Sequence, residues 1–221
     1  MGILELDTFS KQLFIHSNIL LYGNLATQEL VNQCTEEIAT MWNEPKGQVK
    51  LGGETYTAVF IINGFLFHAL TPEDIFNNRN PKNNYFRVEE FAHGNISFVD
   101  GLGCNTGYFK IENLYKGSTT AAHEYGHTLG LDHPDDMDLR GKGVPGIMYP
   151  RGTLVDPQYQ YDPAIPAGQK GGTMHPIYRK VQQQDISNLR LGEYNYGRET
   201  GSLIIGNYSA IYHQPHSSNE A

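Results

Sequence analysis

The sequence predicts an α+β fold built from two parts. Apolar runs typical of strands, together with one stretch of helical spacing, fill the first half of the chain. Between residues 134 and 176 the composition shifts toward Gly, Pro, Asp, Tyr and Gln, and little periodicity remains. Helical spacing then returns. We therefore expect one domain, with an upper subdomain over residues 1–133 and an irregular lower subdomain over residues 134–221 that ends in a helix.

The elements of the upper subdomain follow one another along the chain. Gln12 to Tyr22 is an apolar, β-rich run that predicts a strand. A helix is expected next, from a Thr27 cap to the region of Trp42, because apolar residues recur there at helical spacing: Leu30, Val31, Cys34, Ile38 and Met41. A polar loop is expected from Asn77 to Asn84. Further strands are predicted at Thr55 to Asn63, Tyr85 to Phe91, Asn95 to Val99 and Thr106 to Glu112.

Two more helices are predicted. The first begins at Ser118 or Thr119, directly after Gly117. The second spans Arg179 to Gly192, where Val181, Ile186 and Leu189 recur at helical spacing before a terminal glycine. The chain contains no internal repeat and no low-complexity tract.

Composition limits the classes of partner. The chain has 221 residues, of which 39% are hydrophobic and 18% charged, enough for one compact domain or two small subdomains around a cleft. A formal net charge of −8 and a pI near 5.5 argue against nucleic-acid binding. No segment approaches 18 uninterrupted apolar residues, so no membrane span is expected. We expect a monomer that binds neither nucleic acid nor membrane.

The N-terminal residues and the two cysteines bear on the cellular compartment. Met1 to Ser10 lacks the basic and then apolar pattern of a secretion signal. The protein is therefore expected in the cytoplasm if the chain is full length, and outside the cell if it is a mature fragment. Cys34 and Cys104 leave two alternatives: two buried small apolar residues, or one disulfide that would indicate an oxidising compartment.

One short segment carries the residues of a metal site: His123, Glu124, His127, Gly130 and His133. Residues four apart project from one face of a helix, so His123 and His127 can reach the same ion. Gly130 adopts left-handed φ without steric cost, and a sharp bend there would bring His133 back to that ion. Three neutral imidazoles bind zinc at about 2.0 to 2.1 Å and leave a fourth position for water, as in catalytic sites. Glu124 is placed to take a proton from that water.

This segment resembles the HExxHxxGxxH signature of the metzincin clan of zinc metallopeptidases, in which a turn carrying methionine follows downstream. The residues Gly-Ile-Met-Tyr-Pro that end at Pro150 are similar to that turn in the matrixin branch, so Met148 is expected to form a hydrophobic floor beneath the ligands. Met174 is the alternative and matches only a Met-x-Pro outline. In other branches a tyrosine ligand stands where this chain has Pro150 or Pro176, so no tyrosine ligand is expected.

The resemblance covers about Leu13 to Gly192. It implies a twisted mixed β-sheet with backing helices above an active-site cleft. The residues Gln-Asp-Ile that end at Ile186 resemble the closing helix of matrixins, although the interval after Met148 is longer than in matrixins. Glu193 to Ala221 lies outside the resemblance.

The resemblance implies a zinc-dependent endopeptidase. Zinc would polarise the water and the scissile carbonyl, and Glu124 would act as general base and then as general acid. Asn95 to Val99 is the candidate edge strand to which an extended peptide adds as a further strand, with an ordinary internal strand as the alternative. The methionine turn and Arg151 to Pro166 are expected to line the pocket for the residue after the scissile bond. The alternative function is a catalytically suppressed zinc-binding module used for protein binding or regulation, against which the intact Glu124 argues.

The remaining acidic and histidine residues receive simpler interpretations. Asp135, Asp136 and Asp138 could contribute to a calcium site, but the EF-hand spacing is absent and a solvated acidic loop is the favoured interpretation. The other histidines lack ligand spacing to a common ion and are interpreted as structural or surface residues: His16, His68, His93, His175, His213 and His216.

Overall fold

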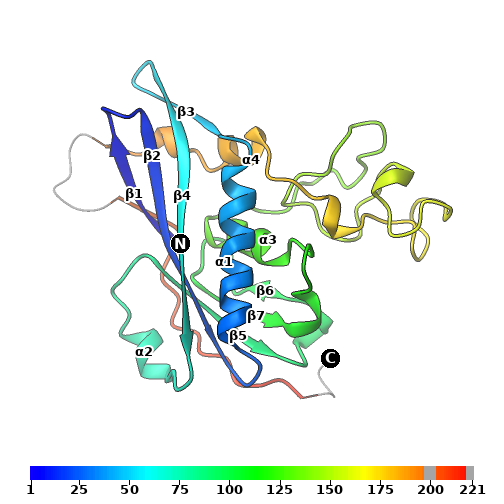
Figure 1. Cartoon of the computed structure of the whole chain (residues 1–221), viewed down its shortest axis with the longest axis horizontal. Helices are drawn as coiled ribbons and strands as arrows, with labels where there is room; N and C mark the ends of the chain where they lie inside the picture. The colour runs from blue at the N-terminus through cyan, green and yellow to red at the C-terminus, as the bar shows by residue number, and fades with distance from the viewer. Residues whose placement is uncertain (197–202, 218–221) are drawn as a thin grey trace.

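A mixed sheet organises the chain in the computed structural model, which describes residues 1–196 and 203–217 (Figure 1). Its strands are β1 (Gly2–Asp7), β2 (Gln12–Tyr22), β3 (Gln48–Leu51), β4 (Glu54–Phe67), β5 (Asn83–Glu89), β6 (Phe98–Val99), β7 (Thr106–Lys110) and β8 (Leu203–Ile205). The α-helices are α1 (Gln28–Asn43), α2 (Pro72–Phe76), α3 (Thr120–Thr128) and α4 (Gln183–Asn188). Short 3₁₀ turns lie at His93–Asn95, Ile111–Asn113, Pro157–Tyr159, Pro176–Tyr178 and Leu191–Glu193.

Strand β2 lies at the centre of the sheet. It pairs in parallel with β4 along its whole length, from Gln12 opposite Thr57 to Tyr22 opposite Phe67. On its other side, the first half of β2 pairs antiparallel with β1 and the second half pairs in parallel with β5. Strands β7 and β6 continue the sheet beyond β5, and β3 lies at the opposite edge. The predicted α+β class with a mixed sheet is therefore confirmed, and β6 is an edge strand.

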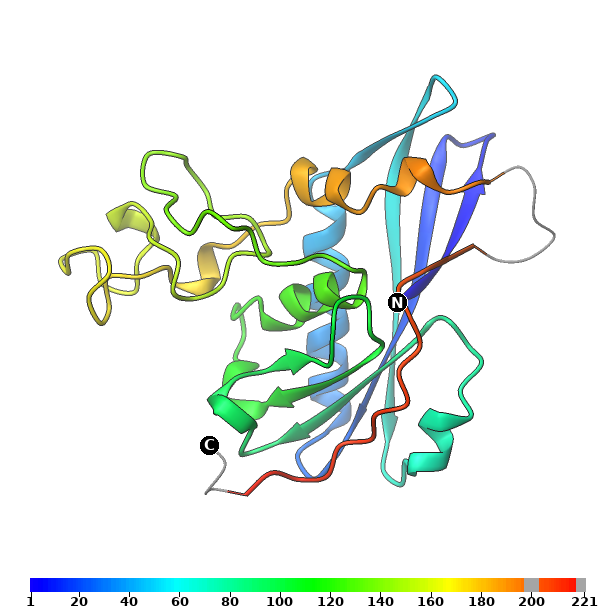
Figure 2. The same ribbon diagram turned by 180° about the vertical axis from the view of Figure 1, so that it is seen from behind.

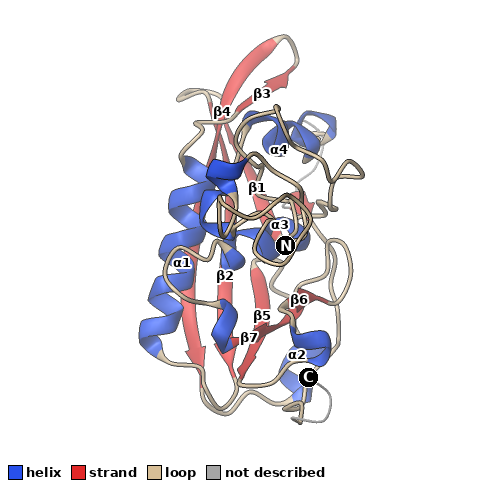
Figure 3. Cartoon of the chain, turned by 90° about the vertical axis from the view of Figure 1, so that its right-hand side faces the viewer, coloured by secondary structure: helices blue, strands red, loops and turns tan. Residues whose placement is uncertain are grey.

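Helix α1 runs along one face of the sheet and connects it to α3 (Figure 3). The Thr27 side chain accepts a hydrogen bond from the Leu30 N–H and so caps the helix, as predicted. The apolar stripe of α1 is buried in the main core, where Trp42 packs against Phe60 and Tyr125. The Trp42 Nε1–H donates to the Ala122 carbonyl at 3.0 Å. This buried indole fixes α1 against α3.

Several predicted elements differ from the observed ones. The strand predicted at Asn95 to Val99 is reduced to β6, because Asn95 has a left-handed φ of 60° in a 3₁₀ turn and only Phe98 and Val99 pair with β7. Only the middle of the helix predicted from Arg179 to Gly192 forms, since Gln182 is extended and Arg190 is left-handed at φ 50°. The predicted Asn77 to Asn84 loop is shorter, because its last two residues begin β5. Helix α2, which has a capping box, was not predicted.

The two cysteines are free thiols, so the disulfide alternative is wrong. Cys34 is buried in the main core, where burial raises the pKa of its thiol. Cys104 is partly exposed and lies in the loop before β7. Cys34 thus acts as a small apolar core residue.

The lower part of the chain is irregular, as predicted. Between α3 and α4 the structure contains 3₁₀ turns and isolated bridges, and this segment extends away from the sheet as a set of loops (Figure 1). A small separate core of Leu139, Val155 and Met174 holds these loops together. Among the described residues, no helix combines the length and the apolar character needed to cross a bilayer.

The C-terminal segment over residues 203–217 returns to the upper part of the molecule and runs along the sheet (Figure 2). Strand β8 pairs antiparallel with β1, and Asn207 bridges to Cys104. Further along, the His213 imidazole contacts the Asp100 carboxylate at 3.0 Å, in the turn after β6. This segment therefore packs on the sheet rather than on the loops of the lower part.

Candidate metal centre

The start of helix α3 is held by groups from elsewhere in the chain. Thr119 has a left-handed φ of 57° and its side chain does not cap the helix. Instead, the Glu37 carboxylate of α1 accepts a hydrogen bond from the Ala122 N–H at 3.2 Å. A carboxylate at a helix N-terminus satisfies an otherwise unpaired N–H and interacts favourably with the helix dipole. Helix α3 is thus anchored at its first turn by α1.

The end of helix α3 is a Schellman motif centred on Gly130. Gly130 has φ +95°, and its N–H donates to the His127 carbonyl at 3.0 Å. The Leu131 N–H donates to the Gly126 carbonyl at 3.1 Å. These two bonds and the left-handed glycine define the motif and reverse the chain direction. The reversal brings His133 back toward the helix that carries the other two histidines.

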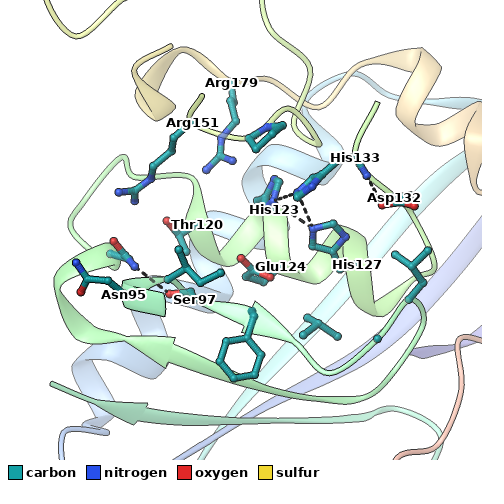
Figure 4. Close-up of a pocket in the computed structure, with 17 residues that line it drawn as sticks. Asn95, Ser97, Thr120, His123, Glu124, His127, Asp132, His133, Arg151 and Arg179 are labelled. Carbon is teal, nitrogen blue, oxygen red and sulfur yellow. Dashed lines mark hydrogen bonds between the residues drawn. The ribbon is translucent and has the colours of Figure 1, made fainter. Parts of the chain in front are cut away.

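The three imidazoles converge on one point (Figure 4). The Nε2 atom of His123 lies 3.1 Å from that of His133 and 3.2 Å from that of His127, and the third pair is 3.1 Å apart. Two ligands of a tetrahedral zinc ion lie roughly 3.3 Å apart when each bond is about 2.0 to 2.1 Å. The observed triangle differs from that value by only about 0.2 Å. Its donor set and spacing therefore fit zinc.

The tautomers of His123 and His127 make their Nε2 atoms available to a metal ion. The Nδ1–H groups of His123 and His127 donate to the carbonyls of Ile147 and Leu131, both at 2.7 Å. In a neutral ring, Nε2 then carries a lone pair and no proton. Two such lone pairs cannot form a hydrogen bond with each other, so a cation bound between them would account for their close approach. Carbonyls that fix the tautomer in this way are typical partners of metal-binding histidines.

Burial keeps the three rings neutral. It lowers the pKa of His127 and His133, and it lowers the pKa of His123 to well below its usual value. The neutral imidazole is the form that binds a metal ion. Among the described residues, these histidines form the one group of three or more His, Cys, Asp or Glu side chains close enough to share an ion.

Glu124 lies beside the histidines and faces the same cavity (Figure 4). Its side chain is buried, with 5% of the residue exposed. Burial raises the pKa of its carboxyl to about 8, while the positive charges of Arg179 and Arg151 act in the opposite direction. No donor within the described residues forms a hydrogen bond to this carboxylate. Glu124 is therefore free to exchange a proton with a molecule in the cavity.

The two candidate methionines occupy different places. Met148 is buried in the main core and lies directly against Gly126 of α3, the helix that carries His123 and His127. Its neighbour Ile147 supplies the carbonyl that binds His123. Met174 lies in the separate core of the loop region and does not line the cavity. The structure thus places Met148 near the three histidines and Met174 away from them.

The cavity has a volume of about 440 Å³ and lies between α3 and the edge strand. One wall is formed by the segment from Asn95 to Val99, and the facing side includes Pro150, Arg151 and Arg179. Of the segment Arg151 to Pro166, which was expected to line a pocket, only Arg151 does so. The rest belongs to the loops that extend away from the sheet.

Arg179 and Glu37 were missed by sequence reasoning. The Arg179 guanidinium is buried and donates to the Thr119 Oγ1 at 2.8 Å and to the Tyr149 and Ser118 carbonyls at 3.2 Å each. It therefore joins the start of α3 to the turn that contains Met148. Burial lowers the pKa of Arg179 to about 10, which leaves it positively charged at neutral pH.

The acidic loop and the other histidines lie outside the cavity. Asp136 forms an ion pair with Lys142, and Asp138 forms one with Arg140. These pairs fit the solvated acidic loop, and a calcium ion there stays a prediction. The remaining histidines have other partners or are exposed, and His175, for example, stacks on Tyr161 with ring centroids 4.4 Å apart.

Comparisons with known proteins identify no family. No protein-family model matches the sequence, and no curated protein matches it. Among solved structures, the crystal structure of archaemetzincin from Methanopyrus kandleri is similar, with 10% sequence identity and a TM-score of 0.42 over 79% of this chain and 94% of that chain. This likeness is too weak to assign a family, and it gives no support to the matrixin branch.

Proposed function

We propose that this protein is a zinc-dependent peptidase of the metzincin type, in which His123, His127 and His133 hold the ion. One observation carries the proposal: the Nε2 atoms of three histidines converge at 3.1 to 3.2 Å in a cavity that also holds a buried glutamate. Three histidines with an open fourth position are the ligand set of catalytic rather than structural zinc sites. The sequence signature supports the same assignment.

The chemistry follows from the groups around this site. When bound, zinc supplies a Lewis acid that polarises a water molecule and the scissile carbonyl. Glu124 accepts the proton of the attacking water and then donates a proton to the leaving amine. Met148, packed against Gly126, supports the helix that presents these groups.

The substrate proposed is an extended peptide or protein segment. Strand β6 pairs with β7 on one side, and residues of β6 line the cavity on the other. An extended peptide that adds to this edge would lie along the cavity past His123 and Glu124. We therefore favour endopeptidase action on a bound strand, by a monomer that needs neither nucleic acid nor membrane.

The test is digestion of a peptide library by the zinc-loaded protein, by its Glu124→Ala variant and by Glu54→Ala as a surface control. Glu54 is exposed, forms an ion pair with Lys11 and does not line the cavity. We expect equal zinc content in all three proteins, cleavage by the wild type and the control, and loss of cleavage in Glu124→Ala. A zinc-loaded wild type that cuts no peptide would indicate the binding module instead. Equal cutting by all three would indicate a contaminant.

A further inference from the structure

The cavity is electrostatically polarised. Figure 4 shows the guanidinium groups of Arg151 and Arg179 on one side of the three imidazoles and Asp132 on the other. All three residues line the cavity. The chain as a whole has a formal net charge of −8, so two arginines at one end of this cavity form a local positive region in an acidic protein.

Arg179 is held rigidly, and the carboxylates of Glu124 and Glu37 favour its charge without forming an ion pair with it. Only 3% of its surface is exposed, and its three hydrogen bonds go to a hydroxyl and two carbonyls, which are uncharged acceptors. A guanidinium has five N–H groups, so these bonds leave one N–H on each terminal nitrogen. Within the described residues, no carboxylate forms an ion pair with Arg179. Its fixed orientation suits it to bind a planar anion in two-point fashion.

Arg151 is positioned beside it with no partner of its own. The side chain is partly exposed, and it forms neither a hydrogen bond nor an ion pair with any described residue. The exposed carboxylate of Glu112, on which the Arg151 charge also acts, forms an ion pair with Lys110 at 2.5 Å. The charges of Arg151 and Arg179 repel each other, and a bound carboxylate would relieve that repulsion.

We propose that Arg151 and Arg179 form a subsite that binds a carboxylate of the peptide substrate. The carboxylate belongs either to an Asp or Glu side chain or to a free C-terminus, and both present the same group to the two arginines. This inference rests on the proposed function, because it takes a peptide as the ligand. It goes beyond that function by assigning a preference for acidic or C-terminal segments.

Binding measured without turnover tests this subsite. The protein is the zinc-loaded Glu124→Gln variant, and the readout is the fluorescence anisotropy of labelled peptides of about ten residues with blocked ends. In one arm, a single Glu is moved through each position and compared with Gln at the same position. In the other arm, a neutral peptide with a free C-terminal carboxylate is compared with its amide at successive lengths. Each pair is measured again with Arg151→Gln added, and with Arg140→Gln added as a matched loss of one exposed arginine.

We expect the carboxylate to strengthen binding about tenfold at one position in one of the two arms, and less as salt is raised. Arg151→Gln should reduce this preference to about twofold or less, and Arg140→Gln should leave it unchanged. The arm that responds identifies the source of the carboxylate. Arg179→Lys, which keeps the charge but loses the planar fork, should weaken the preference to an intermediate value.

The proposal is overturned if neither carboxylate strengthens binding, or if Arg151→Gln and Arg140→Gln have the same effect. Failure of the peptidase assignment is recognised separately, in the library digest by the wild type. A wild type that cuts peptides with no acidic preference, together with carboxylate-independent binding, removes the subsite and leaves the peptidase. A preference in binding without any cleavage removes the peptidase and leaves the subsite.

Discussion

The carboxylate of Glu37 on helix α1 accepts a hydrogen bond from the backbone N–H of Ala122, one residue before His123, the first of the three proposed metal ligands. The N–H groups of Thr119 and Ala121 also donate toward this carboxylate. Helix α3 lacks a side-chain cap of its own, so a residue 85 positions away in sequence closes its N-terminus. The geometry of the metal centre therefore depends on the packing of α1 against α3.

Removing this cap should destabilise the protein. Glu37→Ala leaves buried N–H groups unpaired and should lower the free energy of unfolding by about 1 to 2 kcal/mol, whereas Glu37→Gln keeps an acceptor and should cost less. Urea unfolding measures both. Glu36→Ala, an exposed neighbour on the same helix, is the control, and an equal loss in Glu36→Ala and Glu37→Ala would contradict the capping role.

Asp185 should make stability depend on pH in a predictable direction. Burial raises the pKa of this carboxyl from 3.8 to about 6, so the folded state binds its proton more tightly than the unfolded state. Its stabilising contribution is therefore full below about pH 3.8 and is lost as the pH rises through about 6. In the wild type the Gln182 N–H donates to the Asp185 carboxylate. Asp185→Asn removes the titrating group but keeps a side-chain oxygen that can accept this hydrogen bond.

The free energy of unfolding of the wild type, minus that of Asp185→Asn, should therefore fall by on the order of 2 kcal/mol between pH 4 and pH 7. Urea unfolding at a series of pH values, with equal zinc content in both proteins, gives this difference. Titration of the histidines is common to both proteins and cancels. A difference that stays constant or rises with pH would contradict the raised pKa.

Alanine substitutions of Met148 and Met174 should both lower stability, but only one of them should weaken zinc binding. Met148→Ala and Met174→Ala each remove a buried side chain and should each cost about 2 to 5 kcal/mol. Only Met148 packs against the helix that carries His123 and His127, so only Met148→Ala should also weaken zinc binding. Met148→Leu keeps the volume and should cost less than about 1.5 kcal/mol. Competition with a zinc-binding dye measures the affinity, and equal zinc affinities in the two alanine variants would refute the assignment of Met148.

Substitution of Gly130 should destabilise the protein through its backbone conformation alone. Its φ is +95°, and a Cβ built there meets no atom within 4 Å, so Gly130→Ala creates strain without a clash. We expect a loss of about 1 kcal/mol in the free energy of unfolding and weaker zinc binding, because the Schellman motif orients His133. Gly152→Ala is the matched control, since that glycine is equally open but lacks a positive φ. Similar effects of the two substitutions would argue against this role of the turn.

The features that depend on nearby residues could be predicted from the sequence. Strand β2, the Thr27 cap and the start of α3 were predicted because an apolar run, a capping residue and a glycine lie within a few positions of each element. Strands β1 and β8 were not predicted, since their pairing with each other joins opposite ends of the chain. Arg179 and Glu37 escaped notice for the same reason: their partners at the start of α3, Thr119 and Ala122, are 60 and 85 residues away, and nothing adjacent marks either residue.

The central claim is tested most directly by X-ray diffraction from crystals of the zinc-loaded protein, recorded at the zinc absorption edge. The account predicts one anomalous peak at about 2.0 to 2.1 Å from the Nε2 atoms of His123, His127 and His133, with a solvent molecule in the fourth position beside Glu124. A peak that lies elsewhere, a His133 ring turned away from the ion, or a fourth protein side chain bound to it would contradict the account.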